Sequence, residues 1–127
     1  MKSIIGGLTG AALLLGNSLN AAVVQVNNSD ITGTVQWTAN NTYVLNNFVY
    51  VEAGEVLRIE PGTVIKGKQG TGGNASALFV TQGGQIFAEG TPDNPIIFTS
   101  ELDSTVGESA NVGNANFGLL GSQLWGG

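Results

Sequence analysis

The feature that most constrains the fold of this chain is a segment that occurs twice. Residues 49–60 read VYVEAGEVLRIE, and residues 78–89 read LFVTQGGQIFAE, with a glycine at the same place in both. On both sides of that glycine the side chains alternate with the period of two that is typical of β-strands. A repeat of this length with this period predicts a parallel β-solenoid, in which successive coils stack on one another.

The alternation also predicts which side chains face the interior. Gly54 and Gly83 lie between the two strands of each repeat, where a corner needs a backbone conformation that a Cβ would oppose. On either side of them one phase is apolar in both copies, and we expect this phase to form the core: Val49, Val51, Leu57 and Ile59 in the first copy, and Leu78, Val80, Ile86 and Ala88 in the second.

A third strand completes each repeat. Residues 60–63 read Glu-Pro-Gly-Thr, in which proline presets one backbone angle and Gly62 supplies the positive φ of a turn. The β-prone segments Thr63 to Ile65 and Ile96 to Thr99 follow the corners of the two copies. The expected fold is therefore all-β, a three-sided parallel β-helix.

The ends of the chain predict how it is organised. Lys2, an apolar stretch of about a dozen residues and Ala21-Ala22 form the pattern of a cleaved signal peptide, and the stretch is too short to span a bilayer. We therefore expect a signal peptide at 1–21, a lead-in or N-terminal cap at 22–33, and coils over 34–127 with loops at 66–76 and 101–118. The protein would be secreted or held at the cell surface, without stable membrane insertion.

Composition excludes several classes of function. The chain has nine acidic and four basic residues, a formal net charge of −5, and no cysteine or histidine. Disulfides and thiolate metal sites are therefore excluded, and the scarcity of Lys and Arg argues against nucleic acid as a partner.

Candidate ligand-binding residues follow from equivalent positions in the two copies. Tyr50 and Phe79 should stack on the outer face, and Arg58 should lie against Phe87. Such aromatic side chains could stack on sugar rings or bind a partner, or loop 66–76 or another part of the protein could cover them. Glu60 and Glu89 could lie about 4.8 Å apart on neighbouring coils, as an acid–base or Ca²⁺-binding pair, or they could simply be solvated. No catalytic residue is assigned.

One further segment is rich in oxygen ligands. Glu101, Asp103 and Glu108, with Ser104 and Thr105 between them, could bind Ca²⁺, although the spacing matches neither an EF-hand nor a nonapeptide calcium repeat, and a solvated loop is the alternative. No other cofactor is expected, and no metal ligand is assigned.

The phrases at residues 59–67, 86–91 and 94–100 resemble the right-handed parallel β-helix regions of large secreted or surface proteins of Gram-negative bacteria. The resemblance covers about Trp37 to Gly127. It implies the architecture but no activity, and it implies that Leu119 to Trp125 begins another coil, so that this chain is the N-terminal part of a longer solenoid.

Two hypotheses for function remain open. The first is an exported structural or adhesive module without catalytic activity, which would meet a polysaccharide or another surface protein and could associate with itself through free strand edges. The second is a carbohydrate-active or glycan-binding domain similar to polysaccharide lyases. It predicts a groove that joins Tyr50, Phe79 and Arg58 with Glu60 or Glu89.

Overall fold

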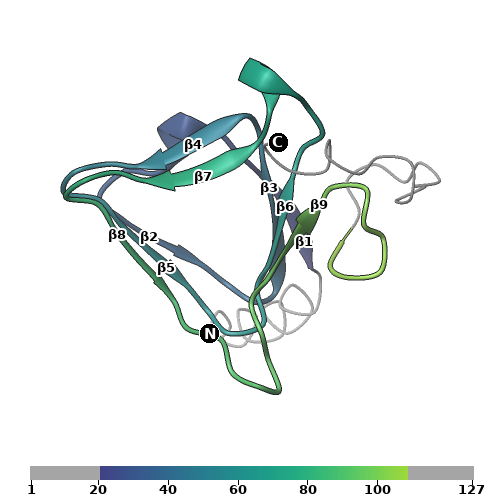
Figure 1. Ribbon diagram of the computed structural model, residues 1–127. Helices are drawn as coiled ribbons and strands as arrows, with labels where there is room; N and C mark the ends of the chain where they lie inside the picture. Colours follow the sequence, from purple (N-terminus) through teal and green to yellow (C-terminus); the bar gives the residue numbers. More distant parts are fainter. Residues whose placement is uncertain (1–20, 109–127) are drawn as a thin grey trace, which may run out of the picture.

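The computed structural model describes residues 21–108, and within this range three parallel sheets wrap around one core. Figure 1 shows them end-on as the three sides of a triangle, and this confirms the expected all-β, three-sided parallel β-helix. The first sheet has the order β1 (Ala22–Val26), β3 (Asn41–Leu45), β6 (Val64–Gly67) and β9 (Ile97–Ser100). The second has the order β2 (Thr34–Trp37), β5 (Val56–Ile59) and β8 (Gln85–Ala88), and the third pairs β4 (Phe48–Val51) with β7 (Ala77–Val80).

The sequence repeat corresponds to strand pairing in two of these sheets, where equivalent residues of the two copies are register partners. Leu78 pairs with Val49, and Ile86 pairs with Leu57, both at the offset that separates the two copies of the repeat. The offset between register partners is shorter for β1 with β3 and for β2 with β5, and it is longer for β6 with β9. Every pair is parallel, so the strands stay aligned while the connections between them change in length.

The core lies inside the triangle and is made of aliphatic side chains with one aromatic pair. The rings of Trp37 and Tyr43 stack at 4.8 Å, and the Tyr43 hydroxyl accepts a hydrogen bond of 2.9 Å from the Thr38 amide. Burying a tyrosine is favourable when its hydroxyl finds such a partner. The buried apolar cluster consists of Val26, Ile31, Trp37, Tyr43, Leu45, Val49, Val51, Leu57, Ile59 and Ile65.

All eight side chains predicted to be interior lie on the inward phase, but four of them are not fully buried. Leu78 and Ile86 are half-buried against the core, Val80 is 43% exposed, and Ala88 is exposed. Their strands, β7 and β8, are the last of their sheets among the described residues. All eight were expected in the core, and these four are covered only in part because a strand with a neighbour on one side only leaves half of its inward surface uncovered.

The corners have the predicted backbone. Gly54 and Gly83 have φ values of 88° and 91°, which confirms them as corner glycines, and Gly62 has a φ of 87°. The Thr63 amide donates to the Glu60 carbonyl at 3.2 Å and closes the turn between β5 and β6. Asn47, at the corner between β3 and β4, also has a positive φ, of 59°.

The first coil begins earlier than Thr34. Residues 22–33, expected as a lead-in, contain β1, which already pairs with β3, and the short 3-10 helix η2 (Asn28–Asp30). The Asn28 side-chain oxygen accepts a hydrogen bond of 2.8 Å from the Tyr50 amide. This part of the chain therefore supplies a strand of the ladder and also caps the free edge of β4.

The loop expected at 66–76 begins later than predicted. Strand β6 continues through Gly67, so that Lys66 is part of a sheet, and the loop that follows carries the 3-10 helix η3 (Gly72–Asn74). Within the described range no helix is long and apolar enough to cross a membrane. The predicted signal peptide, apart from Ala21, and the segments 109–118 and 119–125 lie outside the described residues.

Candidate functional site

The outer side of the two-stranded sheet carries an aromatic cluster of three rings. Val49 and Val51 point inward, so the intervening Tyr50 and its neighbour Phe48 point outward. Tyr50 stacks on its register partner Phe79 at 5.0 Å and 18°, and Phe48 meets Phe79 edge-on at 5.4 Å. The predicted stack is confirmed. Phe79 is 41% exposed, so the cluster presents ring surface to solvent.

A second outward pair lies on the three-stranded sheet. Arg58 and Phe87 are register partners on β5 and β8, and the Arg58 guanidinium lies 4.5 Å from the centre of the Phe87 ring. This cation–π contact is the Arg–aromatic contact predicted from the repeat. The Phe87 ring remains 39% exposed.

These two clusters lie on different sides of the triangle. In Figure 1 the sheet of β4 and β7 and the sheet of β2, β5 and β8 form two sides that meet at a corner. Both clusters point away from the core, because they alternate with buried residues on their strands. The outward faces at such a corner diverge. The structure therefore brings the four residues together as two pairs on two faces, and the pairs do not line a common groove.

Glu60 and Glu89 follow the paired residues Ile59 and Ala88, but the Glu60 carboxylate is directed to the preceding coil. It accepts hydrogen bonds from the Ala39 amide at 2.9 Å and from the Gln36 side chain at 3.1 Å. Glu89 is exposed to solvent. The Glu60 side chain thus stabilises a corner of the solenoid.

The outer side of the four-stranded sheet is covered by residues 101–108, which we call the strap. Beneath it Lys66 is fully buried, and its ammonium donates to the carbonyl oxygens of Asp103 at 2.7 Å and Glu108 at 2.9 Å. Desolvation lowers the pKa of Lys66, and the nearby Asp103 and Glu108 carboxylates oppose that shift. Sequence reasoning missed this residue because it placed Lys66 in a loop, although the inward phase of Ile65 puts Lys66 on the outer face of a strand.

Asp103 anchors the strap to the last strand. Its carboxylate accepts hydrogen bonds from the Thr99 hydroxyl at 2.8 Å and from the Thr105 amide at 2.9 Å, and a very short one from the Thr105 hydroxyl. The hydrogen bonds from Thr105 are the main reason why the pKa of Asp103 is lowered, and those from Thr99 and the charge of Lys66 add to the shift. The carboxylate is therefore held in its ionised form.

The acidic residues suggested for Ca²⁺ have protein partners here. The Glu101 carboxylate accepts a hydrogen bond of 2.7 Å from the Gln69 amide, and the Asp103 carboxylate accepts the hydrogen bonds described above. Among residues 21–108 no group of three or more acidic, histidine or cysteine side chains could hold a metal ion. Calcium binding by this segment stays a prediction.

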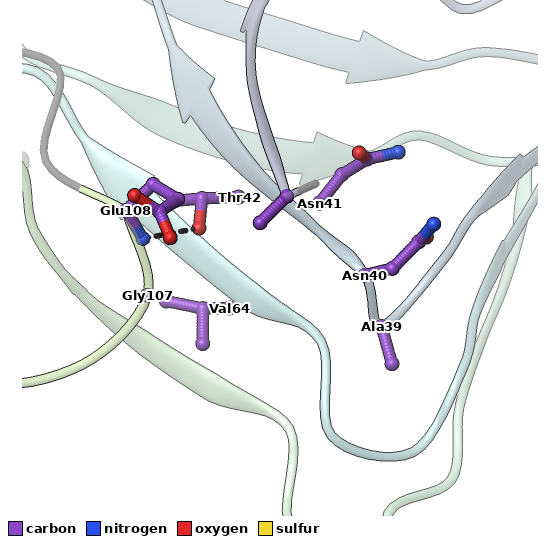
Figure 2. A pocket seen from close by; sticks show the side chains of 8 residues that line it. Ala39, Asn40, Asn41, Thr42, Val64, Gly107 and Glu108 are labelled. Carbon is purple, nitrogen blue, oxygen red and sulfur yellow. Dashed lines mark hydrogen bonds between the residues drawn. The ribbon is translucent and has the colours of Figure 1, made fainter. Parts of the chain in front are cut away.

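A pocket of about 290 Å³ lies where the strap meets the start of the four-stranded sheet. Figure 2 shows Glu108 beside Thr42, with Asn40 and Asn41 at the other end, and the Glu108 amide donates to the Thr42 hydroxyl at 2.8 Å. Gly107 has a φ of +62°, and a Cβ there would lie 2.7 Å from that hydroxyl, so glycine allows the close approach. The lining residues are Ala21, Ala39, Asn40, Asn41, Thr42, Val64, Gly107 and Glu108.

The stacked parallel coils and the outward side-chain ladders define the chain as a parallel β-helix domain. The model of one family, described as a pectate-lyase-like β-helix domain, matches residues 29–116, which is more than half of the chain. The protein belongs to this family. No curated protein and no solved structure matches the chain significantly.

Proposed function

We propose that this protein is an exported, non-catalytic β-helix module that adheres to polysaccharide at the cell surface through its aromatic cluster. The observation that carries the proposal is the stacked Tyr50–Phe79 pair, extended edge-on by Phe48, on a face that presents Phe79 to solvent. Aromatic residues are enriched at binding interfaces, and contiguous exposed apolar surface is a mark of such interfaces. Export rests on the signal peptide predicted at residues 1–21.

The charge of the chain favours a neutral polysaccharide as the ligand. Removal of residues 1–21 takes away Lys2 and leaves nine acidic and three basic side chains, a formal net charge of 3 − 9 = −6. Of the three basic side chains, Arg58 packs on Phe87 and Lys66 is buried. A polyanion would be repelled by the acidic surface and would find few cations to bind. Sugar rings that expose C–H groups can instead stack on the rings of Tyr50 and Phe79.

The family description favours a second candidate, a lyase or hydrolase acting on polysaccharide. Such an enzyme needs a base that faces the reacting carbon and carboxylates close to the substrate. Two contacts support the non-catalytic proposal over this one. The Arg58 guanidinium packs on a phenyl ring, and the Glu60 carboxylate is bound to the Ala39 amide.

Binding to soluble neutral polysaccharides, measured by affinity electrophoresis of the secreted protein, tests the proposal. We expect Phe79→Ala to weaken binding about fivefold, because loss of a stacked ring removes on the order of 1 kcal/mol. The matched control is Phe87→Ala, which removes an equally exposed ring from the other face and should leave binding unchanged. Absence of binding across a broad panel, or equal loss in both variants, would contradict the proposal.

Assays for unsaturated or shortened products distinguish the second candidate. The wild-type protein is incubated with pectate, alginate and the polysaccharides that it binds. We expect no products. Turnover that disappears in Arg58→Ala but persists in Phe79→Ala would replace the adhesive proposal with the catalytic one.

A further inference from the structure

The pocket beside the strap places a carboxylate near the start of the first strand. Glu108 and Ala21 are both part of its wall, and β1 begins at the next residue, Ala22, which pairs with Asn41. A roughly spherical pocket of about 290 Å³ would be about 8 Å across, comparable with the screening length of about 8 Å at physiological ionic strength. A positive charge at the Ala22 nitrogen would therefore interact with the Glu108 carboxylate.

We propose that this pocket is an ammonium-binding site and that its occupant is the protein's own N-terminus, formed when residues 1–21 are removed. The inference rests on the export part of the proposed function. Hydrolysis of the Ala21–Ala22 peptide bond gives the hydroxyl of water to the Ala21 carbonyl carbon and leaves an amine on Ala22, which takes up a proton near neutral pH. Ala21 leaves the pocket wall, and a cation takes its place.

The surroundings of the pocket suit such a cation. The strap binds Lys66 through the main-chain oxygens of Asp103 and Glu108, so the Glu108 side chain is not needed to hold that lysine. The Asn41 side-chain nitrogen donates to the Thr38 hydroxyl, and this orientation leaves the Asn41 side-chain oxygen as an acceptor. Carboxylate and amide oxygens are both suitable acceptors for the N–H donors of an ammonium group.

The charges that face the pocket can be assigned element by element. Residues 38–42, from the end of β2 into β3, contribute no ionisable side chain. Strand β6 lines the pocket with the uncharged Val64, and the strap lines it with Gly107 and Glu108, so that Glu108 is the one ionisable residue among the described residues that line it. The buried Lys66 lies behind this lining, beside the Asp103 and Glu108 carboxylates. The Glu60 carboxylate binds the amide of Ala39, another lining residue. The carboxylates of Glu60, Asp103 and Glu108 around the pocket therefore outnumber the Lys66 ammonium and favour a protonated amine.

The ion pair would connect two distant parts of the chain. β1 lies at one edge of the four-stranded sheet, and the strap follows β9 at the other edge. The Glu108 amide is already fixed to Thr42 on β3. Removal of residues 1–21 would thus add a contact between the strap and β1 to the existing hydrogen bond between the strap and β3. The unprocessed chain would lack this contact, because its Ala22 nitrogen is an uncharged amide.

The direct test is the titration of the Ala22 amine by NMR, in a chain that begins at Ala22 after removal of an N-terminal fusion. We expect the amine to titrate at a pH about 0.5 higher than in an unstructured peptide with the same N-terminal residues, because the carboxylate stabilises its charged form. Glu108→Gln should abolish this difference. Glu89→Gln, which removes an exposed carboxylate elsewhere, should preserve it. An amine that titrates as in the peptide, or one that Glu108→Gln does not affect, would overturn the proposal.

Two further measurements separate failure of this inference from failure of the proposed function. The intact mass of the secreted protein should correspond to a chain that begins at Ala22. A different N-terminal residue in a secreted product would overturn the inference and leave export in place, whereas retention of residues 1–21 would contradict export itself. Glu108→Gln should leave polysaccharide binding unchanged, because the aromatic cluster lies on another side of the triangle.

Discussion

Strand β6 and strand β7 belong to the same coil, yet their inward side chains are buried to very different extents. Ile65 of β6 is completely buried, whereas Val80 of β7 is 43% exposed. β6 lies between β3 and β9, but β7 pairs only with β4 within the described range. The comparison teaches that in this fold the alternation of a strand decides where its side chains point, while burial is decided by whether a strand lies on each side of it.

The largest expected effect is the difference in stability between two alanine variants, one on a strand with a neighbour on each side and one on a strand at the edge of the sheet. Leu57 is fully buried, and its register partner Ile86 is half-buried. We expect Leu57→Ala to lower the free energy of unfolding by about 3 kcal/mol and Ile86→Ala to lower it by about 1 kcal/mol, because only the first leaves an enclosed cavity. Urea denaturation of the two variants measures both values. Equal losses would show that β8 is covered as completely as β5, and the comparison would then fail.

Removal of the Lys66 ammonium should lower the free energy of unfolding by less, and it should mainly weaken the pairing of β9 with β6. Lys66→Ala leaves the carbonyl oxygens of Asp103 and Glu108 without their donor, which we expect to cost about 2 kcal/mol. Hydrogen exchange should accelerate at the amides of Ile97 and Glu101, which hold β9 to β6. The exposed Lys68 provides the control, since Lys68→Ala should change stability by less than about 0.5 kcal/mol. If hydrogen exchange at β9 were unchanged in Lys66→Ala, the contact between Lys66 and the strap would not stabilise the pairing of β9 with β6.

The smallest expected effect is a pH dependence that arises from Asp103. Its pKa in the folded protein lies below the ordinary value of 3.8, so the carboxylate stabilises the fold fully above that value. This contribution is lost as the pH falls below 3.8 through the lowered pKa of the folded state. Unfolding measured from pH 6 to pH 2 should therefore show the difference between wild type and Asp103→Asn disappearing toward the acid end. A difference that is constant with pH would assign the stabilisation to the shape of the side chain and not to its charge.

The sequence predicted the strands best where its two copies align with each other. Tyr50 and Phe79 occupy equivalent positions in the two copies, as do Arg58 and Phe87, and in the structure each pair lies in register and in contact. The pairing of β2 with β5 was not found, because Gln36-Trp37 and Arg58-Ile59 share only their alternation and not their residue types. Periodicity identifies a strand, but it identifies its partner only when the side chains are also similar.

The candidate site was harder to predict because its parts depend on long-range packing. Lysine and glycine are poor strand formers, so Lys66 and Gly67 looked like a loop, and only the strap, which lies far along the sequence beyond β9, explains how the lysine is buried. The expected groove failed for a different reason. Alternation distinguishes inside from outside, but it does not show that the outer faces of β4 and β5 diverge at the corner between them.

The unequal spacing of register partners along the sequence has a consequence for how this chain could be altered. Partners are closest in the sequence between β1 and β3 and farthest apart between β6 and β9, yet both pairs are aligned, and the extra residues lie in the connections between strands. A corner of the solenoid can therefore be lengthened without shifting the ladder on either side of it. The connection that carries η3, after Gly67 and before Ala77, is a natural place to graft a recognition loop, because the strands that flank it would hold both ends of the graft at fixed positions.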